Sequence, residues 1–297
     1  MTARLIKRNS KLFFKDKGMF FTSLITPLIL LILYATFLAG IFRDAYRSGL
    51  PEGILFPDRL LDGLVAGQLI ASLLAVSCVT VTFCVNLIMI QDKTTGAIKD
   101  ITIAPVKKTT LALSYYISTL ISTLIVNLVT FGIGLLFIKV KGWYLSSGDI
   151  LAILLDILLL CMFATALSSI VCYPLKTQGA ASAVGTLISS VYGFICGAYM
   201  PISSFGEGLQ KVLSFLPGTY GTSLLKNHLM RGAFQEMLDI GFPKEAVEGI
   251  KTSIDCNPVF LGHHVTIPEM IMIMVVSIVI LMAVYIMINI FSKKRKA

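Results

Sequence analysis

Six long stretches with almost no charge divide the chain and limit what it can fold into. Five of them contain no Asp, Glu, Lys or Arg, and the fourth contains only Asp156. Each is longer than the roughly 20 apolar residues that a helix needs to cross the hydrocarbon core of a membrane. Because backbone N–H and C=O groups find no water there, each crossing segment must be a helix. We therefore expect six transmembrane helices, within the stretches 18–42, 63–91, 109–138, 150–175, 177–206 and 270–292.

The composition favours an all-α membrane protein over a water-soluble one. The 297 residues are 56% hydrophobic and 14% charged, and the mean hydropathy is +0.85. The first stretch is too long for a signal peptide and ends in no small-residue cleavage motif, so we expect a retained anchor. Five of the six cysteines fall within expected spans, which implies no disulfide framework. The whole chain, 1–297, is expected to form a single transmembrane domain.

Lys and Arg residues predict the orientation of these spans. Residues 1–17 hold six basic residues, 92–108 hold four and 293–296 hold four. Cytoplasmic loops carry an excess of such residues, so both termini and the segment 92–108 are expected on the cytoplasmic side of a prokaryotic plasma membrane. Lys139 and Lys141 would then lie outside, against the rule. The net charge of +9 is an orientation signal, and no nucleic-acid partner is expected.

The segment 1–17 has two faces when it is projected as a helix. Leu5, Ile6 and Phe13 fall on one side, while Arg4 and Arg8 fall on the other with three lysines. A basic amphipathic helix of this kind suits the inner membrane surface, where it would connect to the first span. The alternative is a positively charged flank of that span with no role of its own.

The segment 92–108 joins the second and third expected spans. It has charges of both signs, and Gly96 and Pro105 would interrupt a continuing helix. Its order of acidic residue, Gly, short apolar helix, Ala-Pro-Val and basic residues resembles the first cytoplasmic loop of type-2 ATP-binding cassette (ABC) exporter permeases. In that family the loop forms a coupling helix that docks on the ATPase subunit. The resemblance implies coupling roles for Asp92, Gly96, Ile98 and Pro105.

The region after the fifth stretch supports the same resemblance. The sequence Gly197-Ala198-Tyr199-Met200-Pro201 ends that stretch, and a Leu-Pro-x-x-Tyr element follows at 216–220. This pattern is similar to the re-entrant segment that these permeases carry between their fifth and sixth spans. We therefore expect 201–267 to form a helical, re-entrant outer segment.

Two stripes within the spans bear on mechanism. The first consists of small residues in the fifth stretch and predicts close helix packing, either within the chain or with a second copy. The second consists of polar residues in the second stretch, which would be costly against lipid. They predict ordinary interhelical hydrogen bonding or a wall of the substrate path, and the resemblance favours the path. The packing candidates are Gly185, Ser189, Gly193 and Gly197, and the path candidates are Gln68, Ser72, Thr82 and Asn86.

Asp156 is the one acid expected inside a span. An ionised carboxylate facing lipid is costly, so Asp156 should point into the bundle, in a water-accessible structural role or as a proton relay. The chain has no GxxxxGK[ST] phosphate loop and no HExxH motif, so we expect no enzyme activity of its own. His263, His264 and the distant Cys256 have poor spacing for a metal, and no metal site is expected.

The function expected from these features is that of an exporter permease which binds no cofactor itself. A separate ATPase subunit would hold ATP and Mg²⁺, and a second copy of the chain would complete the transporter. The resemblance implies outward transport of an amphipathic drug, peptide or lipid. One alternative is export of a lipid-linked glycan of the teichoic acid or O-antigen type. Another is a membrane channel or scaffold that uses no ATPase.

Overall fold

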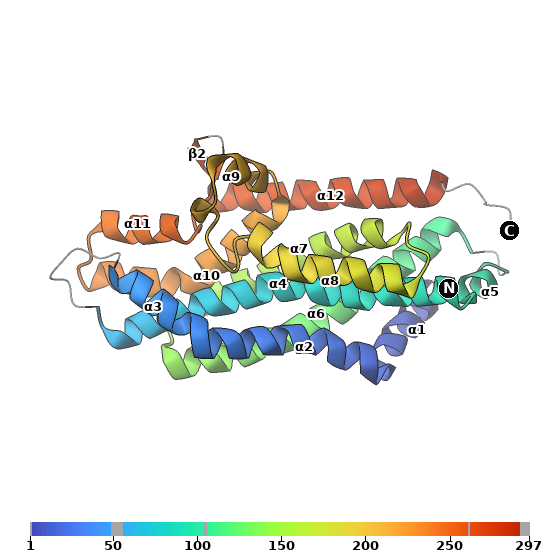
Figure 1. Cartoon of the computed structure of the whole chain (residues 1–297), viewed down its shortest axis with the longest axis horizontal. Coiled ribbons are helices and arrows are strands. Elements are labelled where there is room, and N and C mark those ends of the chain that lie inside the picture. The colour runs from blue at the N-terminus through green and yellow to red at the C-terminus, as the bar shows by residue number, and fades with distance from the viewer. Residues whose placement is uncertain (1, 49–55, 104–105, 261, 292–297) are drawn as a thin grey trace.

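The computed structural model describes residues 2–48, 56–103, 106–260 and 262–291, which form helices and one short β-hairpin (Figure 1). In chain order the elements are α1 (Thr2–Lys15), α2 (Lys17–Leu33), the π-helical turn η1 (Tyr34–Leu38), α3 (Ala39–Ser48), α4 (Asp58–Thr94), α5 (Ala97–Ile103), α6 (Lys108–Lys141), α7 (Ser147–Cys172), α8 (Gln178–Ile195), the 3₁₀ turn η2 (Ile202–Ser204), α9 (Glu207–Ser214), α10 (Pro217–Asp239), α11 (Lys244–Ser253), β1 (Val259–Phe260), β2 (His263–His264) and α12 (Ile267–Phe291). The strands are antiparallel, with Val259 opposite His264.

The long helices run along one axis of the molecule. At one end lie α1, α5 and the C-terminal end of α12, and at the other end lie α3 and α11 (Figure 1). Within the described residues, five helices are long and apolar enough to cross a membrane: Lys17–Asp44, which runs from α2 into α3, and α4, α6, α7 and α12. The expected all-α class is confirmed, and five of the expected spans correspond to long apolar helices that are candidate membrane spans.

The fifth uncharged stretch, 177–206, differs from the expectation of one long helix. Only its first part is helical, and α8 ends at Ile195 after 18 residues. The chain turns because Gly197 adopts a φ of 70°, a left-handed conformation that side chains disfavour. The carbonyl of Gly193 accepts bonds from the N–H groups of Ala198 and Tyr199, at 2.9 and 3.0 Å, and these bonds close the helix. The prediction of one long helix was wrong because the residues after the turn at Gly197 are also uncharged.

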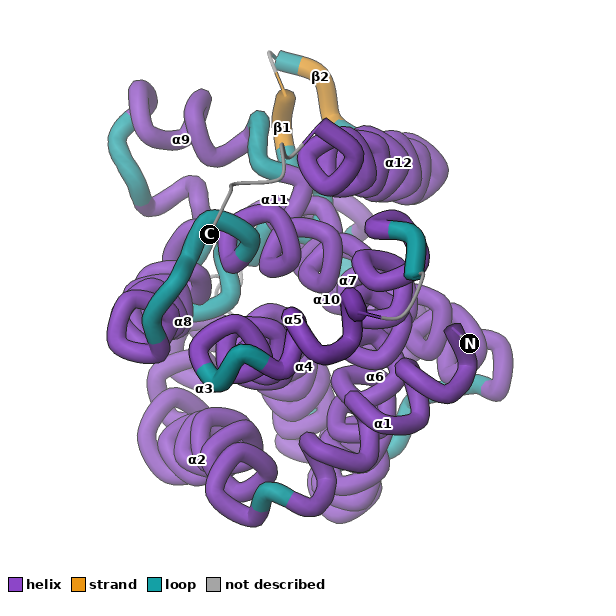
Figure 2. Tube along the Cα trace, turned by 90° about the vertical axis from the view of Figure 1, so that its right-hand side faces the viewer, coloured by secondary structure: helices purple, strands orange, loops and turns teal. Residues whose placement is uncertain are grey.

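Helix α4 is the centre of the bundle. Almost all of its residues from Leu60 to Ile90 are buried, although the helix is only moderately apolar. Seen along the long axis, α4 has α2, α6, α7 and α8 around it (Figure 2). Gly67 and Gly134 let neighbours approach, since a Cβ at either position would meet another side chain or backbone atom at 3.0 Å or less. A helix that is covered on every side transmits movement to all of its neighbours.

The outer segment 201–267 is helical, as expected, but α10 is part of the core rather than a peripheral helix. Lys226 of α10 is buried, and its Nζ donates to the carbonyls of Gly197 and Ile254, both at 2.8 Å. Asp255 accepts a bond from the backbone N–H of Ile202 at 2.6 Å. Burial raises the pKa of the Asp255 carboxyl, and Lys226 opposes that shift. These bonds tie the outer segment to the turn after α8. Re-entry of this segment into the membrane stays a prediction.

Candidate coupling site

A polar contact of three side chains joins α1, α4 and α6 at one end of the bundle. Asp92, in the last turn of α4, has a side chain that is only 6% exposed. Both of its carboxylate oxygens accept bonds from Arg8, at 2.5 and 2.9 Å, and one also accepts from the Tyr115 hydroxyl at 2.6 Å. A bidentate arginine–carboxylate pair fixes orientation as well as distance. The bond to Asp92 raises the pKa of the Arg8 guanidinium.

The sequence of α1 explains why Arg8 reaches Asp92. The helix is amphipathic, as expected for 1–17, and Asn9 and Phe13 form its buried side. Phe13 packs edge-to-face on Phe20 of α2. Arg8 lies at the border of that buried side, where it also donates to the Asn9 side chain at 2.9 Å. The apolar side therefore anchors α1 on the bundle, and Arg8 fixes its position along α4.

A short helix follows Asp92, in the segment that the sequence predicts to couple to an ATPase. Gly96 adopts a φ of 83°, so the chain can leave α4 and begin α5 only five residues after Asp92. Ile98 is half-buried and lines a cavity of about 510 Å³ on the inner side of α5. Ile103, at the end of α5, is 83% exposed. Pro105 lies outside the described residues.

The coupling roles expected for Asp92, Gly96 and Ile98 stay predictions, and the structure shows where these residues lie. Asp92 lies in α4, and its carboxylate is paired with Arg8. Ile103 is more exposed than Ile98. The sequence did not single out Ile103, the exposed apolar residue at the end of α5. The pairing of Arg8 was not predicted from the sequence, because its partner Asp92 lies 84 residues away.

Lys93 ties the same end of α4 to the turn between α7 and α8. Its Nζ donates to the carbonyl of Tyr173 at 2.6 Å and to that of Cys172 at 3.3 Å. These carbonyls belong to the end of α7, where a positive charge compensates the helix dipole. Adjacent residues Asp92 and Lys93 therefore connect α4 to different neighbours.

The four path candidates are all buried in the bundle. Asn86 donates to the Ser168 hydroxyl at 2.6 Å and accepts from the Thr119 hydroxyl at 3.3 Å, which connects α4 with α7 and α6. Gln68 accepts a bond from the Tyr46 hydroxyl, and Thr82 donates to a carbonyl of its own helix. The geometry favours interhelical bonding for Asn86 and Gln68. Ser72 has a buried hydroxyl with no partner among the described residues. A role of these residues in the path stays a prediction.

The small-residue stripe of α8 falls into three different environments. A Cβ on Gly193 would lie 2.2 Å from the Tyr199 ring. Gly193 therefore packs against Tyr199, which lies in the turn that follows α8. Gly197 lies beyond the helix end, in the turn itself. A Cβ on Gly185 would meet nothing within 4 Å, and Ser189 beside it is half-buried. The expected close helix packing at these four residues stays a prediction.

Asp156 forms a buried pair with a residue that the sequence did not connect to it. Its Oδ2 lies 2.6 Å from Nδ1 of His228 on α10, and both side chains are nearly inaccessible. Asp156 thus points into the bundle, where the pair joins α7 to the outer segment. A lone acid in a span requires a partner, but 72 residues separate this partner from it. Among the described residues, no three His, Cys, Asp or Glu side chains gather as a metal site would require.

These features define a multi-pass helical membrane protein with a short helix held beside its central span at one end. The comparison with protein families gives the same class, because the family model of the ABC-2 type transporter matches residues 2–229. The chain belongs to this family of transporters, as its membrane permease domain. No curated protein matches the chain.

Proposed function

We propose that the chain is the permease of an exporter that is powered by ATP bound on a separate subunit. The observation that carries this proposal is the bidentate Arg8–Asp92 pair, next to the short helix α5. A transport protein without a nucleotide site must receive work through a surface contact. Helix α5 offers such a surface. Asp92 and Lys93, in the last turn of α4 just before α5, form bonds with three neighbouring helices. The ABC-2 family membership supports an ATPase as the partner.

The proposed arrangement has six spans, with α8 as the one beyond the five long apolar helices. Its 18 residues correspond to about 27 Å, close to the thickness of the hydrocarbon core. Helix α1 then lies on the inner membrane surface, and both termini are cytoplasmic in a prokaryotic plasma membrane. The location of α1 and the end of α12 at one end of the molecule supports this orientation (Figure 1). Two copies of the chain and two ATPases, with their ATP and Mg²⁺, form the transporter.

The substrate is an amphipathic drug, peptide or lipid that moves outward. Gln68, Ser72, Thr82 and Asn86 line its path when α4 moves relative to α6 and α7. The Ser72 hydroxyl, which has no partner within the part of the chain that the structure describes, supports this assignment. A buried polar group without a partner is costly, and it gains one when water or substrate enters. Asp92 and Gly96 fix the position where the coupling helix α5 begins, and Ile98 packs the inner side of that helix against the bundle. Pro105 belongs to the same segment.

The test is ATP hydrolysis by the reconstituted complex. The purified chain alone should hydrolyse no ATP, and the complex should do so with stimulation by substrate. Gly96→Val strains the left-handed turn, and Ile98→Asp places a charge in the cavity behind α5. Both variants should lose most of the stimulation while expression and membrane insertion remain normal. Lys139→Ala, at the other end of α6, is the control. Full stimulation in both loop variants would contradict the proposed coupling route.

A further inference from the structure

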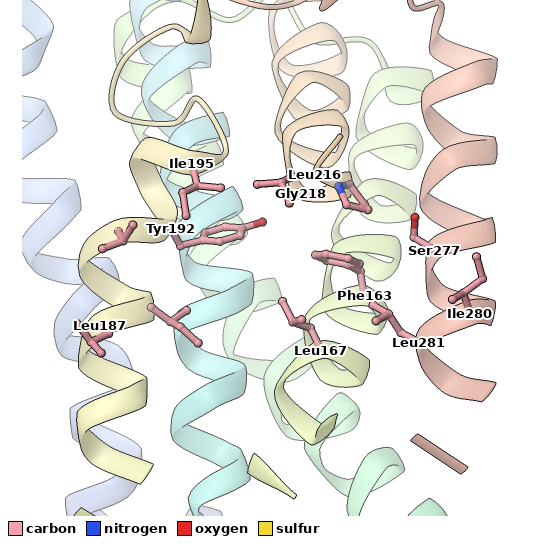
Figure 3. A pocket seen from close by; sticks show the side chains of 13 residues that line it. Phe163, Leu167, Leu187, Tyr192, Ile195, Leu216, Gly218, Ser277, Ile280 and Leu281 are labelled. Atoms are coloured by element: carbon pink, nitrogen blue, oxygen red, sulfur yellow. The ribbon is translucent and has the colours of Figure 1, made fainter. Parts of the chain in front are cut away.

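The cavity behind α5 is lined by positive charge. Its volume is about 510 Å³, and its walls come from α5, the end of α4, the start of α6, the turn between α7 and α8 and the last turns of α12. Lys93, Lys108 and Lys176 line it, and no Asp or Glu does so within the part of the chain that the structure describes. By contrast, the described lining of the groove between α8 and α12 has no charged side chain (Figure 3).

The acidic residues of the neighbouring segments leave this charge in place. Asp92 is already paired with Arg8, and Asp100 is exposed on α5 outside the cavity lining. Lys93 donates to neutral carbonyls at the end of α7, so its positive charge is not cancelled by a carboxylate. The exposed Lys176 has no hydrogen-bond or ion-pair partner among the described residues. The cavity therefore attracts an anion.

The position of the cavity matches the level of lipid head groups. Two candidate spans end beside it, because α6 begins at Lys108 and α12 ends at Phe291. Tyrosine is enriched where spans reach the membrane–water interface, and the cavity lining includes Tyr115, Tyr173 and Tyr285. The start of α6 has no side-chain cap, so the partial positive charge of that helix end adds to the charge of the lysines.

Apolar side chains lie beside the lysines and favour a lipid over a free anion. Met89, Ile98 and Leu111 line the same cavity. Met287 and Ile290, in the last turns of α12, are exposed apolar residues, so an apolar surface continues next to the cavity along a span. A soluble phosphate would gain nothing from these groups, whereas the acyl chains of a lipid would cover them.

We infer that this cavity binds the phosphate of an anionic membrane lipid such as phosphatidylglycerol. Basic clusters beside transmembrane helices attract such lipids. The phosphate lies between Lys108, Lys176 and the start of α6, Lys93 contributes its charge, and the acyl chains follow the apolar surfaces of α6 and α12. The assignment of this lipid to the inner leaflet rests on the proposed function and its orientation. Binding itself does not.

The experiment uses the full chain, purified in detergent without an ATPase, and dioctanoyl phosphatidylglycerol with a fluorophore on one acyl chain. Fluorescence anisotropy should rise with protein concentration and saturate. Unlabelled dioctanoyl phosphatidylglycerol should compete, and dioctanoyl phosphatidylcholine, which has no net charge, should not. Glycerol phosphate, which lacks the acyl chains, should not compete at the same concentration. Equal competition by phosphatidylcholine would overturn the anionic head group, and equal competition by glycerol phosphate would overturn the lipid.

Three lysine variants separate the cavity from general attraction to a basic surface. Lys176→Gln removes one charge from the lining and should weaken binding about fivefold, the effect of one lysine near an anionic lipid. Lys176→Arg keeps the charge and should bind as the unchanged chain does. Lys107→Gln removes the same charge from the exposed N-cap of α6, outside the lining, and should leave the affinity nearly unchanged.

Unchanged affinity in Lys176→Gln would overturn the inference, and so would an equal loss in Lys176→Gln and Lys107→Gln. Lys176 is exposed and has no partner among the described residues, so its substitution leaves the fold intact, which size-exclusion chromatography checks. Because no nucleotide or ATPase is present, failure here is distinct from failure of the coupling proposal.

Discussion

Asp92 shows how a single carboxylate can set the position of a surface helix. Its side chain is almost fully buried, while that of Arg8 is 35% exposed. Removal of Arg8 and removal of the Asp92 charge therefore lower the stability of the fold by different amounts. Without Arg8, the carboxylate keeps only the bond from Tyr115 and remains buried with an uncompensated charge. Without the charge of Asp92, Arg8 can turn toward water. The pair is therefore more sensitive to change at Arg8 than at Asp92.

A double-mutant cycle with Arg8→Gln and Asp92→Asn tests this asymmetry. Arg8→Gln should lower the free energy of unfolding by about 1–3 kcal/mol, a range reduced for the partial exposure of Arg8. Asp92→Asn should cost less, and the double variant should cost less than the sum. Thermal unfolding of the detergent-purified protein measures each value. Arg4→Gln, an exposed residue of the same helix, is the control. Additive effects in the cycle would show that the pair contributes no coupling energy.

Helix α8 shows what spacing along an element can and cannot predict. Small residues every four positions indicate a face that permits close approach, and this much followed from the sequence. The identity of the partner did not follow, because Tyr199 reaches Gly193 only after a turn that Gly197 makes possible. Gly185 is open in the single chain. The two halves of the stripe therefore have different surroundings in the single chain.

Two leucine substitutions separate these contacts. Gly193→Leu would drive a side chain into the Tyr199 ring and should destabilise the single chain by about 1–3 kcal/mol. Gly185→Leu has free space and should leave that stability unchanged. If α8 packs on a second copy, Gly185→Leu should instead weaken dimerisation. Unfolding scans and light scattering of both variants measure the two effects. A stable Gly193→Leu protein would refute the assigned packing of the Tyr199 ring.

At the scale of the whole molecule, local chemistry was readable from the sequence and long-range pairing was not. Charge-free length predicted the long apolar helices, and the two-sided pattern of 1–17 predicted α1. The contacts that join elements depend on residues far apart in sequence, as in the Asp156–His228 pair and in Lys226, whose two acceptors lie in separate turns. No local pattern encodes such contacts. The central position of α4 likewise follows from the packing of all its neighbours.

The proposed orientation predicts a labelling pattern for single cysteines in intact cells. Glu245→Cys on α11 and Ser203→Cys at the start of the outer segment are exposed and should react with an impermeant maleimide from outside. Lys7→Cys on α1 is also exposed and should react only after the cells are opened. The native cysteines are replaced beforehand. Reaction of Lys7→Cys in intact cells would reverse the assignment of the two sides.

The claim that α5 receives an ATPase is tested most directly by copurification of that subunit with two matched variants. Ile103→Asp and Val140→Asp each place one charge at an exposed apolar position, 83% and 84% exposed, at opposite ends of the molecule. Ile103→Asp should reduce the copurified ATPase at least tenfold, because a desolvated apolar contact would become a buried charge. Val140→Asp should retain the ATPase fully. Equal recovery of the ATPase with both variants would contradict docking on α5.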